Sequence, residues 1–415
     1  MTDAGFIEVD CSAVEPDVIR WRRDLHEHPE LGNREFRTSK LVEEHLRSLG
    51  LEIRTGVAHT GIVAILRGAL AGPVVALRAD MDALPVAEAV DLPFASKVRT
   101  VYNGQEVGVM HACGHDAHTA ILMGVAAVLT SLRDSIKGTV VFLFQPAEEG
   151  APEGEEGGAE LMIREGALAD PVPQAVFGLH VTSQLPVGII GTKRASLMAA
   201  VDTLTIKVRG RQTHGAYPWR GVDPIVVAAQ IVLGLQTVVS RQLNSTIGPA
   251  IVTIGSIHGG VRNNIIPAEV DLVGTLRSLD AEMREEIHRR VRQTAERIAE
   301  SSGAKAEVSI TPGYPITFND PELTGSMLPV LAGAAGDANV IEIPPVLGAE
   351  DFAFYQQKVP GMFFFLGTRP PEVSLVDAAP NHAPDFFVDE SGLLLGVRAL
   401  TALALSFLES RANGL

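Results

Sequence analysis

Short apolar runs alternate with amphipathic stretches along the first half of the chain. Runs of strand length, rich in Val, Leu and Phe and bounded by Gly, Pro or Asp, occupy 61–66, 74–77, 139–144 and 175–180. Helical periodicity marks 16–50, where Gly50 is a stop signal, and 119–132. Apolar strands that alternate with helices are typical of α/β proteins. We therefore expect a sheet with helices on both faces.

The middle of the chain has a different order of elements. Residues 201–208 alternate apolar and polar positions, as a half-exposed strand does. The segments that follow read as a helix, two strands, a long amphipathic helix and a strand, at 224–241, 250–258, 268–277, 280–301 and 305–311. This β-α-β-β-α-β order is the ferredoxin-like split unit. We expect 196–312 to be an inserted domain, with 1–195 and 313–415 forming one discontinuous domain around it.

Composition excludes several classes of function. The chain has 415 residues, 46% of them hydrophobic and 20% charged, as ordinary soluble proteins have. Acidic residues outnumber basic ones by 50 to 34, and the resulting charge of −16 argues against nucleic acids and anionic membranes as partners. No apolar run approaches the roughly 20 residues of a membrane span. The start of the chain, 1–10, lacks the features of a signal peptide.

Cysteine usage indicates a reducing compartment. The chain has two cysteines, Cys11 and Cys113, which rules out a disulfide framework. So sparse a pair is typical of free thiols in a reducing environment. We expect a cytoplasmic protein.

The densest cluster of chemistry-bearing residues is 111–118, with three of the twelve histidines, Cys113 and an aspartate. Cys113 and His115 have one residue between them, so both side chains can reach one ion from a tight turn. Thiolate, imidazole and carboxylate together suit zinc, manganese or a similar divalent metal. The alternative is a buried cysteine beside histidines on a wet loop.

Two adjacent carboxylates, Glu148 and Glu149, follow the strand at 139–144. Sites in α/β sheets usually form at the carboxyl ends of strands. One carboxylate of such a pair can ligate a metal while the other takes a proton from water. The alternative is a solvated acidic loop, which is how we interpret the glutamates of 151–160.

Other candidates are more isolated in the sequence. His180 ends a predicted strand, and His382 lies far along the chain; a lone histidine is more often structural than a ligand. In the inserted domain, His214, Asn264 and Arg277 could hold a carboxylate and polarise a carbonyl. The alternative is polar residues at turns and strand ends.

Together these segments resemble the M20 metallopeptidase family, in particular the amidohydrolases that include hippurate hydrolase, N-acyl-amino-acid amidohydrolases and auxin-conjugate hydrolases. The resemblance covers nearly the whole chain. The matching motifs, in chain order, are 22–30, 77–85, 111–116, 145–150, 178–180, 213–218, 264–267, 348–352 and 381–382.

The resemblance implies a catalytic α/β domain with a mixed sheet, interrupted by a lid and dimerisation domain at 196–312. It implies two divalent ions (Mn, Zn, Co or Ni) and a homodimer. Glu148 would be the general base. The implied metal ligands are Cys113, His115, Glu149, His180 and His382. The implied substrate-binding residues of the lid are His214, Asn264 and Arg277, which in this family can act across the dimer.

Two segments depart from the family pattern. Other M20 branches have a metal-binding His-x-Asp where this chain has Arg78-Ala-Asp80, and an arginine cannot ligate a metal. The segment 151–160 is longer and more acidic than the usual glycine loop. It either shapes the substrate entrance or is a solvated loop.

The expected reaction is metal-dependent hydrolysis of N-acyl amino acids to a carboxylic acid and a free amino acid. A metallo-carboxypeptidase or dipeptidase of the same family is the first alternative, since the motifs do not separate acyl groups from short peptides. A metal- or ligand-binding protein that retains the fold is the alternative from another class.

Overall fold

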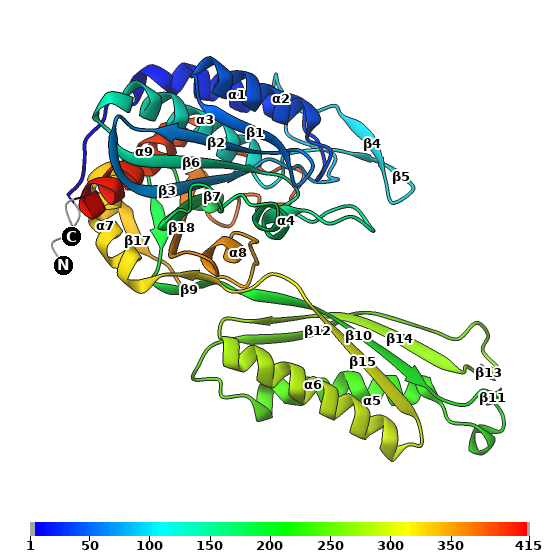
Figure 1. The fold of residues 1–415 in the computed structure, drawn as a ribbon. Helices are drawn as coiled ribbons and strands as arrows, with labels where there is room; N and C mark the ends of the chain where they lie inside the picture. The colour runs from blue at the N-terminus through cyan, green and yellow to red at the C-terminus, as the bar shows by residue number, and fades with distance from the viewer. Residues whose placement is uncertain (1–4, 413–415) are drawn as a thin grey trace. The chain divides into compact units, whose positions relative to one another are not determined.

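The computed structural model describes residues 5–412, and the chain within it forms two compact units (Figure 1). Unit 1 consists of Met1–Ala195, Phe318–Pro344 and Phe354–Leu415, and unit 2 of Ser196–Thr317 and Pro345–Ala353. The prediction that the chain has no signal peptide concerns residues 1–10, of which 1–4 lie outside the described residues.

Unit 1 is built on an eight-stranded mixed sheet. Its strands, in spatial order, are β1 (Glu52–Val57), β2 (Gly61–Arg67), β6 (Lys137–Gln145), β3 (Leu70–Asp80), β7 (Ala175–Pro186), β18 (Gly361–Arg369), β8 (Ile190–Thr192) and β17 (Val340–Glu342). The four central strands β6, β3, β7 and β18 are mutually parallel. They are buried along most of their length, which is why they read as continuous apolar runs.

Helices flank this sheet, which confirms the expected α/β class (Figure 1). The helices are α1 (Glu15–Glu27), α2 (Phe36–Ser48), α3 (His115–Ser131), α4 (Gly158–Arg164), α7 (Pro321–Ala335), α8 (Ala353–Gln356) and α9 (Leu393–Ala412). The helical region predicted at 16–50 is two helices, because Pro29 follows closely on the end of α1. Unit 1 also has the short strands β4 (Arg99–Tyr102) and β5 (Gln105–Gly108), and the strands β9 (Ala195–Met198) and β16 (Thr317–Asn319) span the boundaries of the two units in the chain.

Unit 2 has the β-α-β-β-α-β order that the sequence predicts. Its main elements are β10 (Ala200–Arg209), α5 (Pro224–Thr237), β12 (Ala250–Gly259), β14 (Glu269–Ser278), α6 (Ala281–Ser301) and β15 (Lys305–Pro312). The strands form an antiparallel sheet in the order β12-β14-β10-β15, and α5 and α6 share its apolar core. A small two-stranded antiparallel sheet is formed by β11 (Thr213–His214) and β13 (Ile265–Ile266). The role of 196–312 as a lid and dimerisation domain stays a prediction.

Two helical stretches are long and apolar enough to cross a bilayer by length and composition, Pro224–Gln242 and Glu390–Ala412. The sequence predicts no membrane span, since no apolar run approaches about 20 residues and the run at 224–235 contains Gln230. Of the apolar window in the second stretch, 72% is buried inside the fold, as core helices are, against 33% in the first. The absence of a membrane partner stays a prediction.

Candidate metal centre

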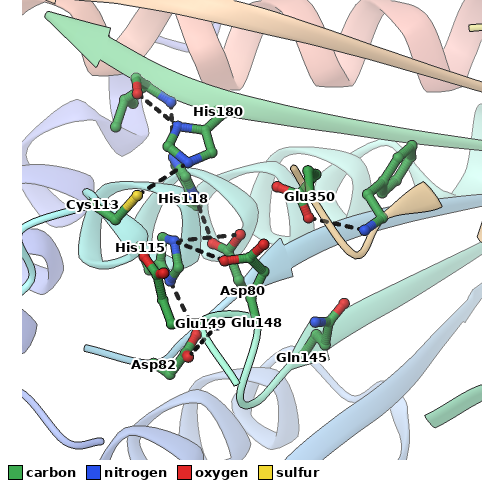
Figure 2. Close-up of polar contacts among 12 residues, drawn as sticks. Asp80, Asp82, Cys113, His115, His118, Gln145, Glu148, Glu149, His180 and Glu350 are labelled. Carbon is green, nitrogen blue, oxygen red and sulfur yellow. Dashed lines mark hydrogen bonds and ion pairs between the residues drawn. The ribbon is translucent and has the colours of Figure 1, made fainter. Parts of the chain in front are cut away.

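The parallel strands of unit 1 end at one edge of the sheet, and the predicted ligands gather there. In the register, Asp80 at the end of β3 lies opposite Gln145 at the end of β6, and Arg78 lies opposite Gly178 of β7. Glu149 therefore follows β6 at the same edge where His180 stands on β7. Figure 2 shows the side chains of Cys113, His115, Glu149 and His180 gathered at this edge.

All five predicted ligands come together. The Sγ atom of Cys113 lies 3.3 Å from Nε2 of His180 and 3.2 Å from Nε2 of His382. Nε2 of His382 lies 3.0 Å from Oε1 of Glu149. Within the described residues, Cys113 belongs both to a group with His115 and His180 and to a group with Glu149 and His382, and in each group the ligand atoms lie within 4.8 Å of one another. Two overlapping ligand sets that share a thiol suit a pair of ions.

The turn that carries Cys113 and His115 depends on a glycine between them. Gly114 has a φ of +88°, and a Cβ at this position would lie 2.2 Å from a methyl group of Val181. A glycine avoids both the strained backbone and the clash. The turn thus places Cys113 immediately before α3 and His115 as its first residue.

Hydrogen bonds fix which nitrogen of each histidine is available. Nδ1 of His115 donates to Oδ1 of Asp82 at 3.0 Å, and Nδ1 of His180 donates to the carbonyl of Val181 at 2.7 Å. Because Nδ1 carries the proton that is donated, Nε2 of each ring in its neutral form holds the lone pair that can bind a metal. Nε2 of His115 is buried and has no hydrogen-bond partner. An orphaned buried nitrogen beside a thiol and carboxylates is what a metal ion would complete.

The electrostatics also fit a cation. Burial and the charges of Glu149 and Glu148 raise the pKa of the Cys113 thiol well above its usual value. Burial alone would lower the pKa of His115, but the charge of Asp80 and the hydrogen bond and charge of Asp82 raise it to about 10. A positive charge among these groups is therefore favoured, and a divalent ion bound there would supply it.

Glu148 lies beside the ligands. Its side chain is buried, and Oε2 lies 3.9 Å from Nε2 of His115. The preceding residue, Ala147, has a φ of +51°, and its N–H donates to the buried carboxyl of Glu35 at 2.9 Å. This anchor turns the backbone so that Glu148 and Glu149 both face the edge of the sheet.

Three residues hold the candidate ligands in place although the sequence predicts no role for them: Asp82, Asn381 and His118. Asp82 accepts hydrogen bonds from His115 and, at 2.9 Å, from the N–H of Glu149. Asn381 donates to the carbonyls of Cys113 and Val181, at 3.2 Å each. Asp82 lies inside the motif at 77–85, and Asn381 directly precedes the candidate ligand His382. These positions are the only features of the sequence that could have indicated their supporting roles.

His118 is the third supporting residue, one turn of α3 after His115. Its Nδ1 donates to Oδ1 of Asp80 at 2.6 Å, and its Nε2 accepts from the N–H of Val181 at 2.8 Å. Both nitrogens are occupied, so His118 is a strut between β3 and β7. The i, i+3 spacing from His115 was the signal for it.

Arg78 is a buried residue of β3, two positions before Asp80. Its guanidinium donates to Oδ2 of Asp80 at 2.6 Å and to Oε1 of Gln145 at 2.9 Å. Although burial opposes it, the charge of Arg78 holds the pKa of Asp80 well below its usual range. Arg78 thus keeps Asp80 ionised for His118.

The three predicted substrate-binding residues lie in unit 2, and the chain does not bring all of them together. His214 and Asn264 are exposed neighbours at the two-stranded sheet β11–β13, where the N–H of Gly215 donates to the carbonyl of Asn264 at 2.8 Å. Arg277 lies near the C-terminal end of β14 and donates to the carbonyl of Leu347 at 3.0 Å. Eight residues of strand, about 26 Å, separate Arg277 from Glu269 at the start of β14, which follows β13 closely in the chain.

The acidic segment 151–160 is partly anchored. Glu155 accepts hydrogen bonds from Arg34 and Asn33, and α4 begins at Gly158. The shortest of these bonds joins Oε1 of Glu155 to the guanidinium of Arg34 at 2.5 Å. The segment is therefore tied to the loop before α2.

Comparison with known proteins points to one family. Residues 76–406 match the model of Peptidase family M20/M25/M40. A solved Bacillus subtilis structure, described as a dinuclear metal binding peptidase from the M20 family, superposes with a TM-score of 0.80 at 38% identity, covering 96% of this chain and 99% of that one.

Relatives named for an activity fall into two groups, carboxypeptidases and hydrolases of N-acyl or conjugated amino acids. The chain is 42% identical to Thermostable carboxypeptidase 2 of Saccharolobus solfataricus, over 96% of this chain and 97% of that protein. It is 40% identical to N-acetylcysteine deacetylase of Bacillus subtilis (95% and 97% covered) and 38% identical to IAA-amino acid hydrolase ILR1-like 4 of Arabidopsis thaliana (94% and 87% covered).

Proposed function

We propose that this chain, which belongs to peptidase family M20/M25/M40, hydrolyses the amide bond of N-acyl amino acids. Membership confirms the resemblance seen in the sequence, and the chain is a metal-dependent hydrolase. The alternative of a metal-binding protein without activity is therefore set aside.

The observation that carries the proposal is the position of Glu148 beside five ligating side chains. A pair of divalent ions held by Cys113, His115, Glu149, His180 and His382 would acidify a water molecule and polarise the carbonyl of a substrate. Glu148 takes the proton of the attacking water. It then gives that proton to the leaving nitrogen, so that the C–N bond breaks and a carboxylic acid and an amine result.

The surrounding residues keep this arrangement rigid. Asp82 orients His115 and the backbone of Glu149, and Asn381 joins the loop of Cys113 to the end of β7. Partners of this kind fix ring orientation and raise the basicity of the ligands. The thiol and imidazole donors suit Zn, Co or Ni, and the carboxylate of Glu149 suits Mn.

The proposal extends to the substrate-binding residues of unit 2. His214 and Asn264 would polarise the scissile carbonyl, and Arg277 would hold the carboxylate of the amino acid. Because His214 and Arg277 lie near opposite ends of β14, one small substrate cannot touch both within one chain. A homodimer in which each copy completes the site of the other would resolve this.

A carboxypeptidase is the second candidate, since the relative from Saccharolobus solfataricus carries that name at 42% identity. Both reactions release a free amino acid from an amide. They differ in the acyl half, which is a simple acid in one case and a peptide in the other.

Amine release from matched substrates tests the proposal. Purified protein would be given N-acetyl, N-benzoyl and N-octanoyl amino acids beside dipeptides, with a chelator or with added Mn, Zn, Co or Ni. Metal-dependent cleavage of the N-acyl amino acids is the expected result. Cleavage of dipeptides alone would move the assignment to the peptidase, and cleavage that a chelator leaves unchanged would contradict the metal centre.

A further inference from the structure

A cavity of about 590 Å³ lies within unit 1 and reaches Glu149 and Asp82. Its walls come from the loop before α2, the segment after β3, the hairpin β4–β5 and the turn after Glu149. Its volume is in the range of small-molecule sites. Because Glu149 is a candidate ligand, a substrate whose scissile bond lies at the metal centre can extend directly into this cavity.

The lining is largely apolar. The side chains that give it this character are Leu31, Leu84, Val98, Val109, Val101 and Tyr102. Val101 and Tyr102 lie on the hairpin β4–β5, which stands out from unit 1 in Figure 1, and they are 71% and 39% exposed. Exposed apolar groups around a concave surface mark a place where an apolar ligand is taken out of water.

The backbone makes the floor of the cavity rigid. Leu31 pairs with Ala83 and Leu84 pairs with Met110 in isolated bridges. Gly32 packs so closely on the turn after Glu149 that a Cβ there would lie 2.8 Å from the carbonyl oxygen of Gly150. These contacts hold the apolar wall of the cavity in a fixed position relative to the candidate metal centre.

The charged groups along the cavity are already paired. Arg34 binds Glu155 at 2.5 Å, and Arg99 binds Glu106 at 2.6 Å. The carboxylate of Glu30 accepts from the N–H groups of Arg37 and Thr38 at 3.0 and 2.8 Å, in the first turn of α2. A carboxylate that entered the cavity would meet acidic side chains and no uncommitted cation, so the amino-acid half of the substrate is disfavoured here.

We propose that this cavity binds the acyl half of the substrate and selects apolar acyl groups of benzoyl size or larger. The proposal rests on the proposed function and adds the substrate class. The hairpin β4–β5 sets the depth of the cavity, and small acyl groups such as acetyl leave its apolar wall in contact with water.

A cavity-narrowing substitution tests the proposal. Val98→Phe fills the half-buried wall, and Val107→Phe, on the same hairpin but outside the lining, is its matched control. For N-octanoyl-glycine we expect Val98→Phe to lower kcat/KM by about tenfold or more, mainly through KM, since misfit in an apolar pocket has this size. For N-acetyl-glycine the change should stay below about threefold, and the control should leave the ratio of the two substrates unchanged.

N-succinyl-glycine, whose acyl chain ends in a carboxylate, provides the opposing case. The ion pairs of Arg34 and Arg99 are 32–66% exposed at their side chains and could open for an anion. Preference for N-succinyl over N-octanoyl substrate would overturn the proposal. Equal loss on all acyl groups in Val98→Phe would do the same, because it would show general damage.

Calorimetry separates failure of the cavity from failure of the proposed function. N-octanoyl-glycine would be titrated into Glu148→Gln protein, with and without Val98→Phe. Binding that is tighter than that of N-acetyl-glycine, and weakened about tenfold by Val98→Phe, supports the cavity even if no N-acyl amino acid is cleaved. Equal binding of both ligands would overturn it even if the hydrolysis is found.

Discussion

Two buried clusters of histidine and carboxylate, one in each unit, differ in whether their hydrogen bonds are complete. In unit 2, Asp202 accepts from Arg284, from His288 at 2.6 Å and from the N–H of Gly313 at 3.3 Å, so its charge is balanced. In unit 1, His115 keeps a buried nitrogen without a partner, and Cys113 lies among carboxylates that oppose its ionisation.

Clusters of the same residue types thus have different roles in the two units. A cluster that satisfies all its members joins parts of the fold, as Asp202 joins β10, α6 and the segment after β15. A cluster in which possible metal-ligating atoms have no hydrogen-bond partner is incomplete without a bound ion. Substitutions in unit 1 should therefore change metal binding or turnover, and those at Asp202 should change stability.

The largest expected effect is at Glu148. Glu148→Gln keeps the size of the side chain but removes the base, so kcat should fall by about 10²- to 10⁴-fold. Metal content, measured by mass spectrometry after dialysis, should equal that of the unmodified protein. Glu153→Gln, in the exposed part of the acidic segment, is the matched control and should keep full activity. Full turnover by Glu148→Gln would refute the role of the base.

The next effect is at Asp82, which touches two ligands without being one. Asp82→Ala frees Nδ1 of His115 and the N–H of Glu149, so metal affinity should weaken about 10- to 100-fold. Competition with a chelator of known affinity measures this, and Asp91→Ala, an exposed aspartate, serves as the control. Unchanged affinity in Asp82→Ala would show that the ligands hold their geometry alone.

At Asp202 we expect a loss of stability without a loss of metal. Asp202→Ala leaves Arg284 and His288 unpaired, which should lower the free energy of unfolding by about 1–3 kcal/mol in denaturant titrations. Glu285→Ala, exposed on the same helix, should change it by less than about 0.5 kcal/mol. Loss of metal in Asp202→Ala would break the distinction between the two clusters.

The smallest effect concerns another buried cluster of histidine and carboxylate, in unit 1. His26 lies between Asp116 at 2.8 Å and Glu88 at 3.0 Å. Burial opposes its charge, but the charge and hydrogen bond of Asp116 and the hydrogen bond of Glu88 raise the pKa of His26. A raised folded pKa gives stability that is fully present below the unfolded value of about 6.5 and is lost as pH rises through the folded value.

His26→Gln removes that titration. The difference in unfolding free energy between the unmodified protein and His26→Gln should therefore shrink as pH rises from about 6 toward about 9. Denaturant titrations across this range measure it. A difference that stays constant with pH would show that His26 acts through packing alone.

Local patterns in the sequence were sufficient for four of the eight strands of the sheet in unit 1, β2, β3, β6 and β7, and for the first two candidate ligands. Cys113 and His115 are close in the chain, and Glu149 follows an obvious strand. His180 and His382 were ambiguous, since a lone histidine gains meaning only when the fold brings it to the same edge. Parallel strands supplied that step, because their carboxyl ends must meet.

The supporting residues were beyond the reach of pattern analysis. The role of His118 depends on a backbone N–H of β7, which no spacing rule identifies. The separation of His214 from Arg277 follows from the length of β14 and not from the residue types. The hairpin β4–β5 was also missed, although Asn103-Gly104, both with positive φ, is a common hairpin turn.

The order of the ligands along the chain has a consequence for biosynthesis. His382 follows the insertion of unit 2, and β18, which precedes His382, must enter the sheet between β7 and β8. Contacts between such distant segments form slowly and late. During translation, Cys113, His115, Glu149 and His180 emerge long before the last ligand, so a nascent chain holds only part of the donor set. Full loading with metal would then report that the C-terminal segment has reached its native place.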